Sequence, residues 1–160
     1  MNRLSLSQVC AIWVLGFGLL SLVAMKRIAT WLNRVRLPIV VKYYLLVIPI
    51  VLLEEVLTIE VPYFWGVLPI LLAFCLFFLI LYLFQRVTRC HWIVASGVFG
   101  LLGWVNEFLL VGRISQMDVV TLIVMSGLCV FIYAVMAILP SYYLQWALRE
   151  RRLRNADSGT

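Results

Sequence analysis

The sequence predicts an all-α integral membrane protein, a bundle of five transmembrane helices with its N-terminus outside and its C-terminus in the cytoplasm. Composition is the first observation, because 65% of the 160 residues are hydrophobic and only 12% are charged, with a mean hydropathy of +1.08. Soluble domains are far more polar. Apolar stretches of roughly 20 residues, enough to cross a hydrocarbon core of about 30 Å, also recur along the chain. The basic residues, finally, gather on alternate connections between these stretches.

The apolar stretches follow one another with short connections, so residues 1–160 are expected to form a single transmembrane domain. The expected helices are about 9–25, 39–57, 67–84, 92–111 and 119–146, and residues 147–160 form a basic cytoplasmic tail. The first stretch ends without a small-x-small cleavage triplet and is followed directly by Lys26 and Arg27, which is typical of a stop-transfer segment. Pro49, Pro69 and Pro140 predict local kinks.

The basic residues predict the orientation. With the N-terminus outside, only Arg3 and Arg113 of the 13 Lys and Arg residues fall on the outer side. This agrees with the positive-inside rule and favours a plasma or inner membrane. The basic cytoplasmic rim is expected to bind anionic lipid headgroups. Because its arginines are spread over short loops without a soluble platform, no nucleic-acid partner is expected.

Acidic residues gather at the opposite ends of the expected helices. Glu54 and Glu55 lie in "LLEEVLTIEV", near the outer end of the second helix, and Glu107 lies near that of the fourth. At 1.5 Å per residue, Glu54 and Glu107 both lie about 22 Å above the inner ends of their helices, so they are expected at one level. Adjacent helical residues point about 100° apart. The sequence leaves open which of Glu54 and Glu55 faces the bundle interior.

A stripe of small residues on the fourth expected helix is predicted to turn Glu107 inward. Ser96, Gly100, Gly103 and Glu107 follow at spacings of 4, 3 and 4, and small residues let helices approach closely in lipid. The neighbouring Asn106 can donate to a carboxylate.

These residues predict a polar site in the outer leaflet. Glu54, Glu55 and Glu107 are its candidate catalytic, acid-base or proton-carrying groups, while Asn106 and Arg113 are candidate substrate-binding or orienting groups. Under the alternative interpretation, the same side chains only anchor helix ends at the membrane interface.

No metal or cofactor is expected from the sequence. The four cysteines are scattered without a CxxC pair, and His91 is the one histidine. Zinc sites and haem sites need closely spaced thiols or further imidazoles. No phosphate-binding glycine loop or nucleotide motif is present.

The paired glutamates resemble those of two families without satisfying either pattern. In the prenyl-protein-processing intramembrane proteases, Glu-Glu-x-x-x-Arg would place an arginine where this chain has Ile59, and His91 lies at the wrong end of its helix. The segment "LLEEVLTIEVPYFW" is similar to the Pro-x-Glu-Glu segment of heterodimeric lycopene cyclases, but the proline is displaced to Pro49. The chain is therefore assigned to neither family.

Three function classes remain open from the sequence. The first is a small accessory or assembly subunit that packs against a larger membrane protein. The second is an intramembrane enzyme that uses glutamate acid-base chemistry on a lipid-like or isoprenoid substrate. The third is an oligomeric proton or cation conductor. Small size and little catalytic variety favour the first class, with a membrane-protein partner or a homo-oligomer as its expected assembly.

Overall fold

The computed structural model describes residue 8 and residues 11–58, 64–110 and 112–157, and these are helical apart from short connections. In chain order the elements are η1 (Ile12–Gly18), α2 (Leu19–Arg34), α3 (Ile39–Thr58), α4 (Phe64–Thr88), α5 (Trp92–Trp104), η2 (Val105–Leu110), η3 (Arg113–Gln116) and α6 (Val119–Asp157). The predicted all-α class is therefore confirmed for the described residues.

Four helical stretches within the described residues are long and apolar enough to cross a membrane. They are Leu15–Arg34, Leu68–Thr88, Trp92–Leu109 and Val119–Leu153. The chain is accordingly a membrane protein with helical spans. α3 has a comparable length of 20 residues, but it carries Lys42, Glu54 and Glu55 among its apolar side chains.

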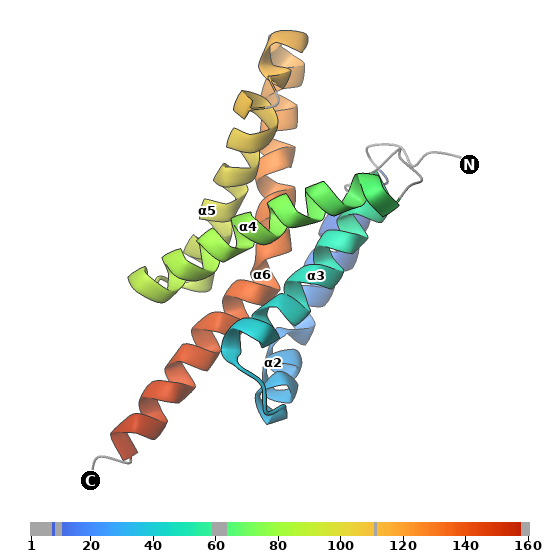
Figure 1. Cartoon of the computed structure of the whole chain (residues 1–160). Coiled ribbons are helices and arrows are strands. Elements are labelled where there is room, and N and C mark those ends of the chain that lie inside the picture. The colour runs from blue at the N-terminus through green and yellow to red at the C-terminus, as the bar shows by residue number, and fades with distance from the viewer. Residues whose placement is uncertain (1–7, 9–10, 59–63, 111, 158–160) are drawn as a thin grey trace.

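Local sequence explains where several helices begin, end and bend. The Pro38 carbonyl accepts a hydrogen bond from the Lys42 backbone N–H at 3.1 Å, which starts α3. Proline is tolerated there because the first N–H groups of a helix have no partner within it. α6 changes direction along its length (Figure 1). Pro140 lies inside this helix, and an internal proline removes a backbone hydrogen bond and bends the helix.

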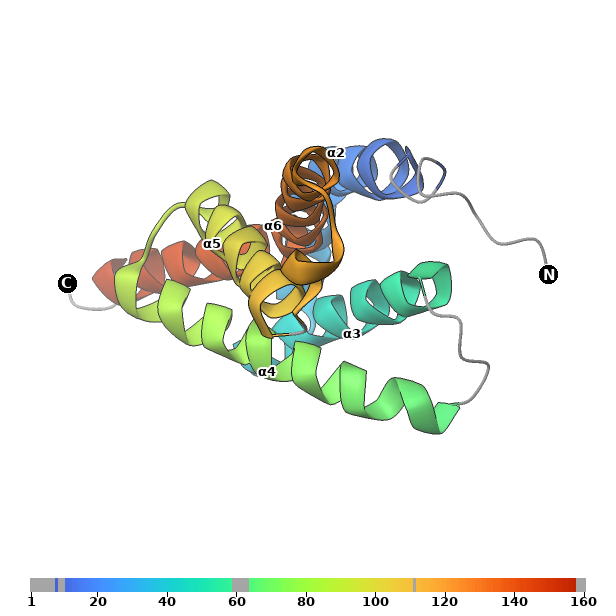
Figure 2. The same cartoon turned by 90° about the horizontal axis from the view of Figure 1, so that it is seen from above.

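α6 is the central helix of the molecule, because α2, α3, α4 and α5 all contact it. Seen from above, α2 and α4 lie on opposite sides of α6 (Figure 2). In the other view, α5 and the first half of α6 form an arm that diverges from the ends of α2 and α3 (Figure 1). We call this pair of segments the α5–α6 arm.

An aromatic core joins α4, α5 and α6 where the α5–α6 arm begins. The rings of Phe78 and Phe99 lie 4.2 Å apart between centroids, and Phe74 stacks on Tyr133 at 5.8 Å. On the other side of α4, the Tyr44 hydroxyl donates to the Cys75 carbonyl at 2.8 Å. Ring pairs of this kind contribute about 0.5–1.5 kcal/mol each beyond the area they bury. The core therefore fixes α3, α5 and α6 around α4 and sets the position of the acidic residues.

Candidate functional site

Glu55 is the buried member of the glutamate pair on α3. Its side chain is 4% exposed, whereas Glu54 is half-buried. The two carboxyl groups are nevertheless hydrogen-bonded to each other. The sequence left open which of the two glutamates faces the bundle interior. In the structure Glu55 faces inward, and the side chain of Glu54 contacts it.

A hydrogen bond between two carboxyl groups requires a proton on one of them. Ionised carboxylates only accept hydrogen bonds, and a protonated carboxyl adds one donor. The Oε2 atom of Glu55 is buried and has no hydrogen-bond partner among the described residues. A buried, unpartnered oxygen of this kind is costly when it is charged.

Tyr133 connects Glu107 to the central helix. The Tyr133 hydroxyl donates to Oε1 of Glu107 at 2.9 Å, and the tyrosine side chain is 7% exposed. Glu107 is half-buried and belongs to η2, a π-helical turn that continues α5. Single π-helical turns are rare and often lie at functional sites, because they change the direction of the side chains beyond them.

The small residues of α5 make room for this contact. A Cβ atom added to Gly103 would lie 2.2 Å from the Tyr133 ring, and one added to Gly100 would lie 2.4 Å from the carbonyl oxygen of Val130. Ser96 is also buried on this helix. The stripe predicted from the sequence thus lies against α6, and the absent side chain at Gly103 admits the ring whose hydroxyl reaches Glu107.

Four side chains from three helical elements form one electrostatic unit, which we call the acid cluster: Glu54, Glu55, Glu107 and Tyr133. The carboxyl of Glu55 interacts electrostatically with that of Glu107, and Tyr133 interacts with both Glu107 and Glu54. The structure therefore brings together the three glutamates that the sequence selected, and joins α3, η2 and α6 through them.

The other two predicted site residues do not join this cluster within the described part of the chain. Asn106 is half-buried beside Glu107, yet its amide makes no hydrogen bond to another described residue. The backbone of Arg113 begins η3, but its side chain lies outside the described residues. Its role as counter-charge stays a prediction.

Tyr133 is the residue that sequence reasoning missed. It lies 26 positions from Glu107, on a helix whose rotation the sequence does not fix. The one feature of the sequence that pointed toward Tyr133 was Gly103, because a glycine on a packed helix face leaves space for a large side chain of the neighbouring helix. Gly103 indicated close packing but did not identify the ring that fills the space.

The acid cluster can store a proton and can clamp three helices together. Its polar groups lie among apolar side chains, where hydrogen bonds are strong and an unpaired group is costly. Among the described residues, no group of three or more His, Cys, Asp or Glu side chains is arranged to hold a metal ion. The groups that the cluster itself contributes are three carboxyls and one phenol hydroxyl.

Comparison of the chain with protein-family models, with curated proteins and with solved structures finds no match in any of the three.

Proposed function

We propose that the chain is a small accessory or assembly subunit of a larger membrane complex, with α3 as a fifth span, the N-terminus outside and the C-terminus in the cytoplasm. The observation that carries the proposal is the incomplete packing of α6. From residue 119 to residue 132 no residue of α6 is buried, whereas from Tyr133 to Leu144 most are. The exposed part is the half that belongs to the α5–α6 arm.

The exposed side chains on the arm are large and apolar. Ile123 is 67% exposed and Val124 is 54% exposed on α6, and Leu101 is 58% exposed on α5. Gly127 has open space where a side chain would lie. Helices associate in lipid through close packing at small residues rather than through the hydrophobic effect. None of the 14 residues of α6 on the arm is buried, and Gly127 leaves space for a neighbouring helix. The arm is therefore suited to pack against a helix of another protein.

A tryptophan scan of lipid-exposed positions tests this proposal. Ile123→Trp and Gly127→Trp place a bulky ring on the arm, while Leu76→Trp and Leu83→Trp place it on exposed positions of α4. We expect the arm variants to reduce the amount of co-purified partner about 10-fold and the α4 variants to retain it, with circular dichroism unchanged in all four. Equal recovery of the same complex from all four variants would contradict the proposal.

The orientation has its own support and its own test. All basic residues except Arg3 and Arg113 fall on one side in a five-span topology, which the positive-inside rule assigns to the cytoplasm. A cysteine introduced at Ser158 should be protected from a membrane-impermeant maleimide in intact cells, and one introduced at Ser115 should react. The reverse pattern would overturn the orientation.

A specific observation favours proton exchange as a second candidate function. Glu54 and Glu55 interact with each other next to an unpartnered carboxyl oxygen, and the Tyr133 hydroxyl donates a hydrogen bond to Glu107. In liposomes that contain the purified protein, a proton pathway through the cluster would give a pH change that Glu55→Gln and Glu107→Gln abolish. A flux that both variants leave unchanged would exclude the cluster from the pathway.

A further inference from the structure

A second polar site lies away from the acid cluster, where the end of α4, the turn into α5 and the second half of α6 meet. It is a pocket of about 260 Å³. Its described lining contains Arg89, Arg149 and Arg152 and no acidic side chain. Three positive charges around one hollow, without a carboxylate beside them, favour an anion as ligand.

Two glutamines give the pocket a fixed frame. The Gln85 amide, 1% exposed, donates from Nε2 to the Ser141 carbonyl at 2.9 Å, and Oε1 of Gln145 accepts from the Trp92 backbone N–H at 2.8 Å. These bonds tie α4 and α5 to α6 at the pocket. Oε1 of Gln85 is buried and has no hydrogen-bond partner among the described residues. The pocket therefore also offers an acceptor that a ligand hydroxyl can satisfy.

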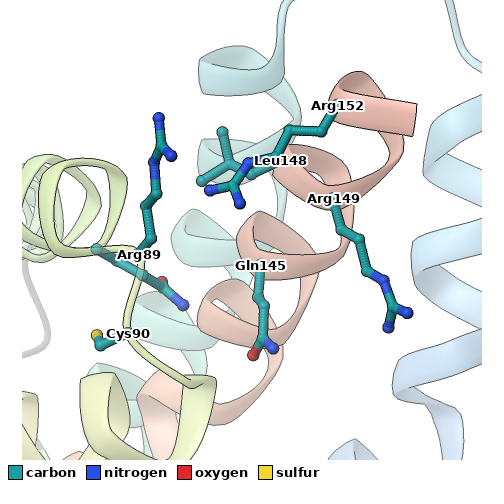
Figure 3. Close-up of a pocket in the computed structure, with 7 residues that line it drawn as sticks. Arg89, Cys90, Gln145, Leu148, Arg149 and Arg152 are labelled. Atoms are coloured by element: carbon teal, nitrogen blue, oxygen red, sulfur yellow. The ribbon is translucent and has the colours of Figure 1, made fainter. Parts of the chain in front are cut away.

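Arg89 is held over the pocket by an unusual backbone conformation. Its φ is 55°, in the left-handed region that side chains other than glycine seldom adopt, and its N–H donates to the Gln85 carbonyl at 2.8 Å. In Figure 3, Arg152 extends from α6 toward Arg89, whereas Arg149 points away from both. Two guanidinium groups thus approach from opposite sides of the pocket.

We propose that this pocket binds a phosphate group with a neighbouring hydroxyl, of the kind found in a glycerol phosphate headgroup. Guanidinium groups recognise phosphate oxygens through paired, charge-assisted hydrogen bonds, which Arg89 and Arg152 supply. The side-chain oxygen Oε1 of Gln85 accepts a hydrogen bond from the ligand hydroxyl. The ligand can be the headgroup of an anionic lipid or a soluble phosphate ester, because both present the same atoms. The site is independent of the accessory role proposed above.

A second basic pocket has a similar charge but lacks the other features of the phosphate site. It is formed by α2 residues only, among them Lys26, Arg27 and Arg34. It lacks the frame of buried amides from neighbouring helices that fixes the first pocket, so a general attraction for anions accounts for it.

Binding measurements on the whole chain in phosphatidylcholine nanodiscs test the proposal with two probes, phosphatidylglycerol in the disc and glycerol 3-phosphate in solution. Arg89→Gln and Arg152→Gln remove the pocket charges. Arg86→Gln and Arg151→Gln are matched controls, because they remove the same charge from nearby exposed arginines on α4 and α6 that do not line the pocket.

We expect the two pocket variants to weaken binding at least about 10-fold and the two controls to leave it unchanged within twofold. The loss of one charge-assisted hydrogen-bonded pair is of that size. Native mass spectrometry should count one retained ligand per chain. Saturation by phosphatidylglycerol alone identifies a lipid headgroup site, and saturation by glycerol 3-phosphate identifies a soluble ligand. Equal weakening in all four variants, or binding of neither probe, overturns the proposal.

Discussion

At the level of single residues, the acid cluster depends on the hydroxyl of Tyr133. This group supplies the hydrogen bond from α6 to Glu107 at 2.9 Å, while the ring beneath it packs on Phe74 and fills the space at Gly103. The ring and the hydroxyl therefore make separable contributions. Removing the hydroxyl alone tests the clamp without leaving a cavity.

Tyr133→Phe should lower the free energy of unfolding by about 1–3 kcal/mol, because it removes a largely buried hydrogen bond to a carboxyl group. Denaturant or thermal unfolding in detergent measures this change. Tyr142→Phe is the matched control, since this half-buried neighbour uses its ring against Trp92 and makes no hydroxyl hydrogen bond to a described residue. Equal effects of the two changes would show that the Tyr133 hydroxyl does not stabilise the fold.

Asp118 gives the start of α6 a pH dependence. Its carboxylate accepts from the Thr121 hydroxyl at 2.6 Å and from the backbone N–H groups of Val120 and Thr121 at 3.0 Å. These hydrogen bonds, that of the Thr121 hydroxyl foremost, lower the pKa of Asp118 below its ordinary value. A lowered pKa in the folded state stabilises the helix end above the ordinary aspartate pKa, and this stabilisation is lost as the pH falls through the folded-state value.

Lowering the pH below about 4, the pKa of an unperturbed aspartate, should therefore loosen the first turn of α6. Hydrogen exchange of the Val120 and Thr121 amides, corrected for the intrinsic pH dependence of exchange, should show falling protection over this range. Asp118→Asn keeps a capping oxygen but does not titrate, so its protection should stay flat. A pH profile in the aspartate protein that matches the asparagine variant would contradict this assignment.

At the residue level, the sequence indicated that the three carboxyl groups lie near one another, but it did not indicate their partners. Glu54, Glu55 and Glu107 stand out because charge is rare in an apolar chain, and equal helical rise predicts a common level. The sequence could not select Tyr133 among seven tyrosines, since the rotation of α6 about its axis depends on packing. Gln85 and Arg89 were missed as site residues for the same reason, because they meet Arg152 only through tertiary contact.

At the scale of helical elements, the closest packing is between α5 and α6. Gly100 and Gly103 face α6 with no room for a methyl group, whereas Gly97 on the same helix has open space around it. These three glycines form an internal comparison, because the same substitution meets a different neighbour at each position. A change from glycine to alanine raises the helix propensity equally at all three positions. Differences in stability among the three variants therefore measure packing.

Gly103→Ala and Gly100→Ala should each destabilise the protein by about 1–3 kcal/mol, the cost of overpacking an interface. Gly97→Ala should be neutral or stabilise by up to about 1 kcal/mol, because alanine is the better helix former. Unfolding titrations of the three variants measure the differences. Gly103→Ala should also disturb the Tyr133–Glu107 contact. Destabilisation by Gly97→Ala to the same extent would show that helix packing at the stripe is not the cause.

Helical elements were predictable because long apolar runs and prolines define them locally. The π-helical turn η2 and the left-handed Arg89 were not, since neither carries a glycine or proline at the position concerned. The π-helical turn contains Asn106 and Glu107, which the sequence analysis placed by ideal helical geometry.

At the scale of the whole molecule, packing is uneven along α6. Its second half is the centre of the molecule, and its first half has no buried residue before Tyr133. The acid cluster lies at the transition, so it fixes the base of the α5–α6 arm and leaves the rest to contact lipid or another protein. The sequence could not predict this divergence, because the hydropathy of a span is the same whether lipid or protein covers it.

The mass of the particle that contains this chain tests the central claim most directly. The chain should be extracted with its surrounding lipid by an amphipathic polymer, without detergent, and weighed by native mass spectrometry or light scattering. We expect a particle in which the 18.4 kDa chain is joined in fixed stoichiometry to a larger membrane protein, and we expect Ile123→Trp to release that protein. A monodisperse 18.4 kDa monomer from the native membrane would contradict it.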